Sequence, residues 1–352
     1  MAETTISSPR RSASATARPE RSSRSLPSRR SRIRYWTVLG VLAVLAVGFG
    51  FGLLAWDNPM PVGSEGFWRI AEMRSTNLVV MAVVAICQSI ATVSFQTVTN
   101  NRIITPSIMG FEALYVAVQT AGVYFIGVAG VVALQGLPQF MLQVAVMVGF
   151  AMVLYGWLLS GKYANLQVML LIGIVIGGGL ASVSTFMQRL LTPSEFDVLA
   201  ARLFGNISNA DASYLPVVIP LCLVAAGLLL LSSRRLNIVA LGRDASTSLG
   251  MNHRKETIRV LFLVSILMAV STALVGPMTF LGFLVATLAY QFADTHDHRY
   301  VLPLSALTCF VVLSGAYFVM RNIFYAQGVV SIIIELVGGV VFLFVILRKG
   351  RL

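Results

Sequence analysis

The sequence predicts an all-α, polytopic membrane protein of about ten transmembrane helices. Of its 352 residues, 57% are hydrophobic and only 11% are charged, whereas soluble domains are about 45–50% apolar and about 25% charged. The mean hydropathy is +0.82. A water-soluble fold of this length would lack the polar side chains needed to cover its surface, and apolar runs of membrane-spanning length recur along the chain.

These apolar runs fill almost the whole sequence. A transmembrane helix needs about 20 mostly apolar residues, and only Gly276-Pro277 separates the seventh run from the eighth. Ten such runs leave no segment for a separate soluble domain. The expected spans are 36–55, 77–97, 108–129, 138–160, 166–188, 213–232, 257–275, 278–293, 301–319 and 328–347.

The first 34 residues differ in composition from the rest. Residues 1–34 are rich in Ser, Arg, Pro and Ala and hold nine of the 26 Lys and Arg residues. Because few large apolar residues interrupt this charge, we expect 1–34 to form a disordered basic cytoplasmic tail, followed by a transmembrane domain over 35–352. The net charge of +12 therefore reflects a tail attracted to anionic membrane lipid, not a nucleic-acid partner.

The remaining positive charges predict the orientation. Cytoplasmic loops of membrane proteins carry an excess of Lys and Arg. With the N-terminus inside, 21 of the 26 basic residues lie on the inner side. We therefore expect a multi-pass protein of the cytoplasmic (plasma) membrane, the inner membrane of a two-membrane cell, with both termini in the cytoplasm. The outer set is Arg69, Arg74, Arg189, Arg202 and Arg321.

The longest inner loop, about 233–256, predicts two short helices. Leu236 and Val239 recur at helical spacing, while 244–249 begins with Asp and is followed by Gly250, as at the start and end of a short helix. Short amphipathic helices at a membrane surface either lie in the interface or bind a partner. This loop is therefore the first candidate for a partner-binding site.

The run 156–163 nearly spells a phosphate-binding P-loop. A P-loop needs a strand before it and Ser or Thr after its Lys. Here an expected spanning helix precedes the run, and Tyr163 follows Lys162. We interpret Lys162 as an inner-side anchor and expect a chain that is no enzyme, with no nucleotide site and no bound cofactor of its own.

The cysteines and histidines do not form a metal-ligand pattern. Cys87, Cys222 and Cys309 lie in separate apolar runs without a Cys-x-x-Cys spacing, and structural zinc needs four close ligands. Residues 294–299 hold two His and two Asp. Because this segment lies between two expected spans, we interpret it as a solvated turn and expect no metal site and no catalytic residues.

Two carboxylates and one glycine pattern fall inside the expected spans. A carboxylate at membrane depth usually faces a cavity or a partner. Glu112 is expected near an inner helix end, either hydrated or capping a helix; alternatively, Glu112 and Glu335 serve a proton- or ion-coupled secondary transporter. Gly173 and Gly177 permit close helix contact, either for packing within the chain or for lining a pathway.

Four short motifs occur in a fixed order. Residues 101–115 contain Thr-Pro-Ser-Ile-Met-Gly-Phe, 241–250 contain two Leu-Gly pairs, 276–286 contain Gly-Pro and Phe-Leu-Gly-Phe-Leu, and 297–303 begin with Asp-His-Arg. This order resembles the FecCD family, the permeases of ABC importers for iron-siderophores, haem and vitamin B12, over about 36–350. The first motif is similar to that of the iron-chelate uptake subgroup, which includes catecholate siderophore permeases.

The resemblance implies a type II ABC importer permease fold, in which two ten-span subunits enclose one pathway. It implies that this chain translocates ferric siderophore into the cytoplasm. The implied partners are a second, similar permease subunit, two ATPase subunits that bind ATP and Mg²⁺, and an extracytoplasmic solute-binding protein. The alternatives are a secondary transporter, as above, or a receptor subunit that transports nothing.

The resemblance also assigns roles by position. Arg74 and Arg321 would bind the solute-binding protein, unless they only extend toward the membrane interface. The cytoplasmic coupling helices are placed near 238–252, with ATPase-coupling residues Ala240, Leu241, Gly242, Ser246, Leu249 and Gly250. The gate and pathway residues would be Asn101, Ile103, Asn165, Leu166, Gln167 and Glu335. Two positions depart from the family pattern: Arg102 replaces a usual Pro, and Glu335 a small or amide residue.

Overall fold

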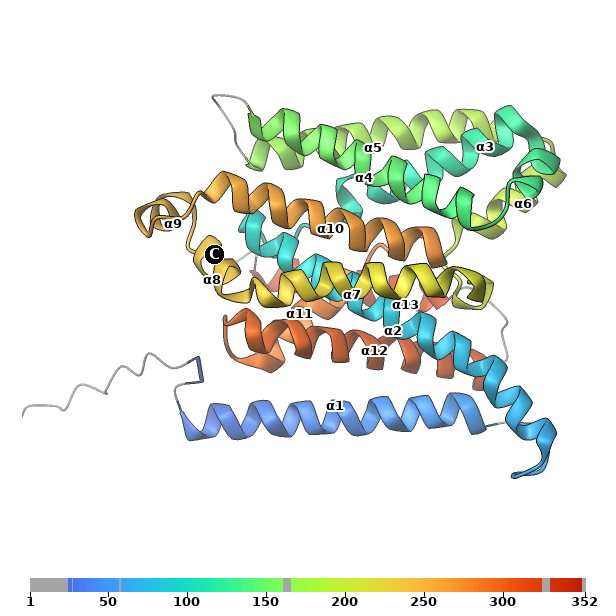
Figure 1. Ribbon diagram of the computed structural model, residues 1–352, viewed down its shortest axis with the longest axis horizontal. Coiled ribbons are helices and arrows are strands. Elements are labelled where there is room, and N and C mark those ends of the chain that lie inside the picture. Colours follow the sequence, from blue (N-terminus) through green and yellow to red (C-terminus); the bar gives the residue numbers. More distant parts are fainter. Residues whose placement is uncertain (1–24, 27, 57, 161–165, 325–329, 350–352) are drawn as a thin grey trace, which may run out of the picture.

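The computed structural model describes residues 25–26, 28–56, 58–160, 166–324 and 330–349 (Figure 1). All regular elements in these ranges are helices. Ten are long or strongly apolar: α1 (Arg29–Ala55), α2 (Glu65–Thr99), α3 (Phe111–Ala133), α4 (Leu137–Ser160), α5 (Leu166–Arg189), α7 (Leu215–Leu231), α10 (His253–Val275), α11 (Leu281–Ala293), α12 (His298–Asn322) and α13 (Val330–Lys349). The short ones are α6 (Pro193–Leu203), α8 (Ser233–Val239), α9 (Arg243–Ser248) and the 3-10 turns η1 (Ser107–Met109), η2 (Ile207–Asn209) and η3 (Ala212–Tyr214).

The expected spans match these helices. By length and composition, eight helices of the described chain can cross a membrane: α1 to α5, α7, α10 and α12. The other two apolar helices, α11 and α13, are shorter over their described residues. Each of the ten expected spans overlaps one of these ten helices, which confirms the all-α polytopic fold.

The tryptophans mark the two membrane boundaries. Trp36, Trp56, Trp68 and Trp157 are all exposed and lie near helix ends, where tryptophan prefers the membrane–water interface. Trp36 lies near the start of α1, and Trp56 directly follows its last residue. Their separation along the sequence corresponds to about 30 Å of helix, the thickness of a bilayer's hydrocarbon core.

The start of α1 corrects the boundary of the expected tail. Residues 29–34 were assigned to the disordered segment, but α1 begins at Arg29. Ser28 caps it, because its hydroxyl accepts a hydrogen bond from the Ser31 N–H at 2.9 Å and the Ser31 hydroxyl lies 3.2 Å from the Ser28 N–H. This reciprocal cap satisfies two free donors of the first turn. Residues 1–24 and 27 lie outside the described part of the chain.

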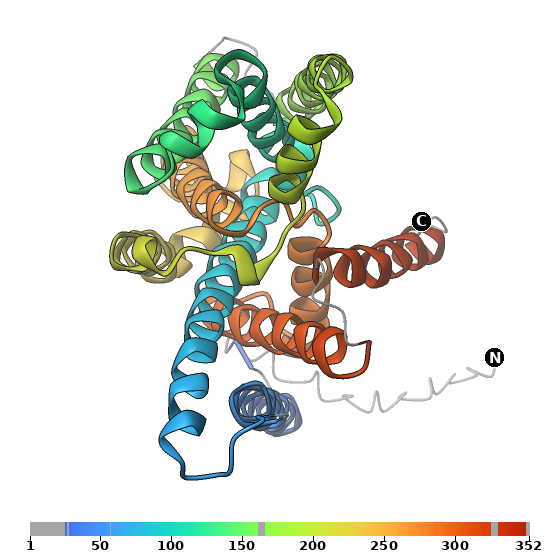
Figure 2. The ribbon, with the colours of Figure 1, turned by 90° about the vertical axis from the view of Figure 1, so that its right-hand side faces the viewer.

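α2 is the central helix of the bundle. It is buried over most of its length and contacts α1, α7, α10, α11 and α12. Within this core the Sγ atoms of Cys87 and Cys222 lie 3.3 Å apart, joining α2 to α7 as free thiols. α1 packs at one edge and α13 projects from another (Figure 2).

Two helices, α3 and α11, begin inside the bundle rather than at its surface. Gly110, with φ of 99°, precedes α3, and a Cβ atom added to Gly177 would lie 3.1 Å from the Gly110 Cα. Gly177 lies about 16 Å along α5 from its first residue at the helical rise per residue. The chain after α2 therefore re-enters the bundle, and α3 starts about halfway through. Gly173 and Gly177 serve packing within the chain, as one alternative proposed.

We expect Gly177→Leu to destabilise the protein by about 1–3 kcal/mol, because the new side chain meets backbone that cannot move aside. Thermal unfolding in detergent micelles measures this change. Gly179→Leu is the matched control, since a Cβ atom there meets nothing within 4 Å. Equal loss of stability in the two variants would contradict the packing described for α3 and α5.

Candidate functional site

One end of the bundle combines α8 and α9 with the start of α1, the turn after α2 and the loop 294–297; we call it the α8–α9 end (Figure 1). Leu236 and Val239 of α8 are buried and anchor this helix to the bundle. Ser246 of α9 is also buried, and its hydroxyl lies 2.9 Å from His253 Nδ1 of α10. Both helices predicted in the 233–256 loop are therefore present and fixed to the core.

The turns that follow α8 and α9 each present a leucine to the outside. Leu241 and Leu249 are 62% and 63% exposed. Gly242 and Gly250 follow them with φ of 92° and 81°, a backbone conformation that favours glycine. Paired apolar side chains on a rigid, otherwise polar projection are typical of a protein-binding surface. Of the six residues assigned to ATPase coupling, these four and Ala240 lie on the projection, whereas Ser246 holds it together.

His298 ties α8 to two long helices. It is 3% exposed, and its Nε2 atom lies 2.6 Å from Thr97 Oγ1 of α2. Its backbone N–H donates to Asn237 Oδ1 of α8 at 3.0 Å, while Asn237 Nδ2 donates to Asp297 Oδ1 at 2.8 Å. His298 Nδ1 lies 2.5 Å from the same Asn237 oxygen, so this nitrogen must carry a hydrogen. We call His298, Asn237, Thr97 and Asp297 the His298 cluster.

The cluster corrects the interpretation of 294–299 as a solvated turn. Only part of this segment is exposed, because Asp297 caps α12 through a hydrogen bond from the Arg299 N–H and His298 is buried. The Ser25 hydroxyl also donates to Asp297. Within the described chain, no group of three or more His, Cys, Asp or Glu side chains could hold a metal ion.

A cavity of about 510 Å³ opens beside the His298 cluster. Arg102 forms one wall, with its guanidinium 4.5 Å from the Tyr290 ring centroid and 3.2 Å from His296 Nδ1. Arg102, which stands where the family usually has Pro, thus makes a cation–π contact at the α8–α9 end. The cavity lies between the exposed Leu241 and the core, where a movement of α8 would change its shape.

The expected gate residues lie in separate places. Asn101 accepts hydrogen bonds from the Ile103 and Ile104 N–H groups at 2.9 and 3.3 Å, which orders the turn after α2. Ile103 is exposed. Leu166 and Gln167 begin α5, whereas Asn165 lies outside the described residues, as does Lys162 of the P-loop-like run. The part of the turn that reaches α5 is η1.

Glu112 lies about halfway through the bundle, not near its inner end as expected. Its carboxylate accepts hydrogen bonds from the Met278 N–H at 3.2 Å and the Thr279 hydroxyl at 2.5 Å. These residues precede α11, so Glu112 in the first turn of α3 holds the segment that leads into that helix. Glu335 of α13 is partly buried.

The opposite end of the bundle holds Arg74 and Arg321. The Asn77 amide donates to the Tyr317 hydroxyl at 3.3 Å, so α2 and α12 are adjacent there. Arg74 and Arg321 lie one turn beyond this contact on the two antiparallel helices. Arg74 donates to the Leu54 and Trp56 carbonyl oxygens at 3.3 and 2.8 Å. It therefore binds the end of α1, a structural role that the sequence did not suggest.

Three residues of the α8–α9 end were missed by sequence reasoning: Thr97, Asn237 and Tyr290. Thr97 and Tyr290 lie inside apolar runs, where a single polar or aromatic residue attracts no notice. Asn237 lies between the anchoring Leu236 and Val239. An amide beside the buried stripe of an amphipathic helix, in a chain that also contains Asp-His-Arg, is the signal that would have identified it.

Comparison with known proteins identifies the family. The family model described as the FecCD transport family matches residues 38–348. The chain is 51% identical to the petrobactin import system permease protein FatC of Bacillus anthracis, over 94% of each chain. It is 33% identical to the petrobactin import system permease protein YclO of Bacillus subtilis, over 88% of this chain and 96% of the relative. FatD, a second petrobactin import permease of Bacillus anthracis, is 23% identical over 90% and 93%.

The fold also has a solved counterpart. A structure described as a metal-chelate type ABC transporter in an inward-facing conformation aligns with a TM-score of 0.74. It covers 89% of this chain and 99% of that chain at 19% identity, so it supports the fold alone. The ten helices, the ordered motifs and the match over 38–348 agree. The chain is a multi-pass membrane protein that belongs to the FecCD transport family.

Proposed function

We propose that this chain is the permease subunit of an ABC importer that carries a ferric siderophore, of the petrobactin class, into the cytoplasm. The observation that carries this proposal is the 51% identity to FatC over 94% of both chains. YclO, also named for petrobactin import, supports the same substrate class. Glu112 is held by hydrogen bonds from the segment before α11, and the match to the FecCD transport family favours an importer permease over a proton-coupled transporter.

We infer that the chain pairs with a second, different permease. FatC and FatD are two permease proteins named for one import system in one organism, and this chain is 51% identical to the first but 23% identical to the second. The outward faces of α5 and α13 support pairing there, because Gly178 and Gly179 meet no neighbour and Leu336 and Leu343 are exposed. A pathway between two such faces would include Glu335 and the turn from Asn101 to Ile103.

The α8–α9 end is the proposed contact for two ATPase subunits, which would bind ATP and Mg²⁺. Leu241 and Leu249 form the apolar part of that contact. The His298 cluster then links this contact to α2 and α12, because Asn237 of α8 bonds to His298 and His298 contacts Thr97. A state in which the ATPases close would favour one position of α8 and hence one arrangement of the long helices.

The orientation follows from the same assignments. With the ATPases in the cytoplasm, both termini are cytoplasmic, and Arg321 lies on the extracytoplasmic side. Arg321 and Arg74 are the proposed contacts for acidic residues of a solute-binding protein. Because Arg74 already binds the end of α1, Arg321 is the more informative of the two to test.

We expect deletion of this chain to abolish uptake of radio-iron supplied as ferric petrobactin, since no other part of the importer supplies its half of the pathway. Re-expression restores uptake only together with a FatD-like permease. Uptake of ferric hydroxamates in the same cells is the control and should persist. Unchanged petrobactin-dependent uptake in a strain without redundant systems would overturn the proposal.

Two variants separate binding of the ATPase from transmission of its movement. Leu241→Glu should weaken co-purification of the ATPase by at least about tenfold, the effect of placing a charge in an apolar contact worth about 1.4 kcal/mol or more. Asn237→Leu should leave co-purification unchanged but lower the iron transported per ATP hydrolysed in proteoliposomes. It removes the partner of the His298 N–H, an unsatisfied donor that costs about 1–3 kcal/mol.

Ile323→Glu is the control for both, because it places the same charge on an exposed apolar residue at the opposite end. It should change neither ATPase binding nor the transport ratio. If Asn237→Leu transported normally per ATP while Leu241→Glu lost the ATPase, the contact would stand and the His298 cluster would not be its link.

Arg321→Glu should weaken binding of the solute-binding protein by about tenfold at low salt, with a smaller effect at high salt, because exposed charges are screened. Surface plasmon resonance on nanodisc-embedded importer measures the change. Arg254→Glu carries the same charge reversal at the α8–α9 end and should bind normally. A larger effect of Arg254→Glu would mean that the orientation is reversed.

A further inference from the structure

The first turns of α1 carry an excess of positive charge that the fold does not need. Arg29, Arg30, Arg32 and Arg34 lie within the first six residues of the helix, and its first turn contains no acidic residue. A helix N-terminus is itself electropositive, so cations there are unfavourable. Arg30 and Arg34 are also four residues apart on one helix, where like charges repel. An anionic partner would offset both costs.

Within the described chain, acidic side chains neutralise only part of this positive charge. Arg34 forms an ion pair with Asp294 at 3.4 Å and donates to the Gln291 carbonyl at 3.1 Å. No carboxylate of the described residues lies within 4 Å of Arg29 or Arg30. Of the four arginines, only Arg34 is paired within the described chain, and Arg29, Arg30 and Arg32 remain to be neutralised.

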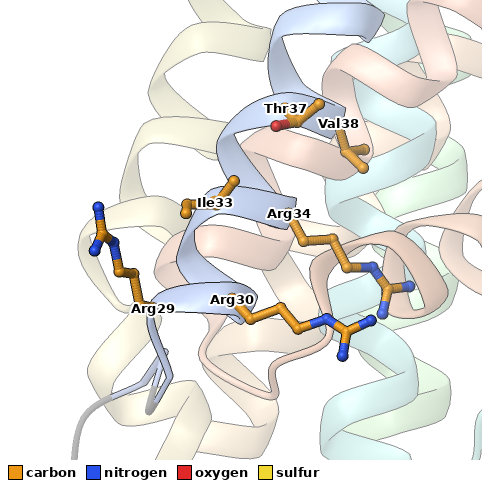
Figure 3. A pocket seen from close by; sticks show the side chains of 6 residues that line it. All are labelled: Arg29, Arg30, Ile33, Arg34, Thr37 and Val38. Carbon is orange, nitrogen blue, oxygen red and sulfur yellow. The ribbon is translucent and has the colours of Figure 1, made fainter.

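These arginines border a hollow of about 520 Å³ whose remaining lining is Ile33, Thr37 and Val38. Figure 3 shows Arg30 and Arg34 extending to one side of α1 and Arg29 to the other, with Thr37 and Val38 further along the helix. A guanidinium offers several N–H donors in one plane, which suit a phosphate group. The charged rim therefore fits a phosphate, and the apolar lining fits what is attached to it.

The apolar lining continues along the helix. Ile33, Val41 and Val44 lie on one face of α1, and all three are exposed, Val44 by 73%. This stripe runs from the level of the arginines into the membrane-spanning part of α1. A soluble anion or an acidic peptide would leave it uncovered, whereas an acyl chain would cover it.

We propose that Arg29, Arg30 and Arg34 form a binding site for the phosphate headgroup of an anionic phospholipid, with its acyl chain along Ile33, Val41 and Val44. The site does not depend on the transported substrate or on the ATPase contact. It differs from a general attraction of a basic tail to a membrane, because one helix supplies both the headgroup site and the acyl-chain surface.

Native mass spectrometry of the purified full chain in detergent, titrated with phosphatidylglycerol or phosphatidylcholine, tests the site. We expect saturable binding of phosphatidylglycerol and much weaker binding of phosphatidylcholine. The double variant Arg29→Gln with Arg30→Gln should lower the affinity for phosphatidylglycerol roughly 30-fold, from the contribution of two basic residues near an anionic lipid. Arg34 is left unchanged because it pairs with Asp294.

The matched control is Arg254→Gln with Lys255→Gln, an exposed basic pair at the same end with the same change in charge. It should keep the affinity of the unchanged chain. Equal loss in the two double variants, or equal binding of both lipids, would overturn the proposal. Displacement of phosphatidylglycerol by millimolar inorganic phosphate would also overturn it, because the site would then be an anion site without a role for the acyl chain.

Discussion

The structure depends on one constraint: inside a bilayer, every backbone group that leaves a helix needs another partner. Two helix interruptions of the described chain lie before α3 and before α11, and α3 itself is kinked at Gly127. Glu112 resolves the second interruption, because its carboxylate accepts from the Met278 N–H and the Thr279 hydroxyl. The close contact of Gly110 with Gly177 places α3 where Glu112 can do so. Glu112, which one alternative treated as a proton-coupling residue, therefore accepts hydrogen bonds that stabilise the fold.

The same constraint explains why the connection to α8 is polar and discrete. Apolar contacts hold the long helices together, and their attraction has no preferred direction. The His298 cluster is different, because hydrogen bonds between α2, α8 and α12 are either satisfied or broken. Burying such a cluster makes its loss costly. Hydrogen bonds of this kind suit α8, because this helix must move as one body with the long helices.

Sequence reasoning succeeded where periodicity and composition decide the outcome. Hydropathy located all ten apolar helices, and Gly250 marked the end of the second short helix. It failed where the chain folds back on itself: Glu112 was placed at an inner end because nothing in 101–110 announces a re-entrant turn. It also missed Arg74's bonds to α1 and the burial of His298. These depend on which helices are neighbours, which a single sequence does not encode locally.

The basic residues show the same limit of prediction from a single sequence. The sequence divides 26 basic residues into an inner and an outer set, as if each only marked a side of the membrane. In the structure Arg74 binds the end of α1, Arg102 stacks on Tyr290 and Arg34 pairs with Asp294. Each of these contacts is intramolecular and fixed. The charges that remain without such partners, such as Arg29 and Arg30 within the described chain, are therefore the ones whose partners must be sought outside it.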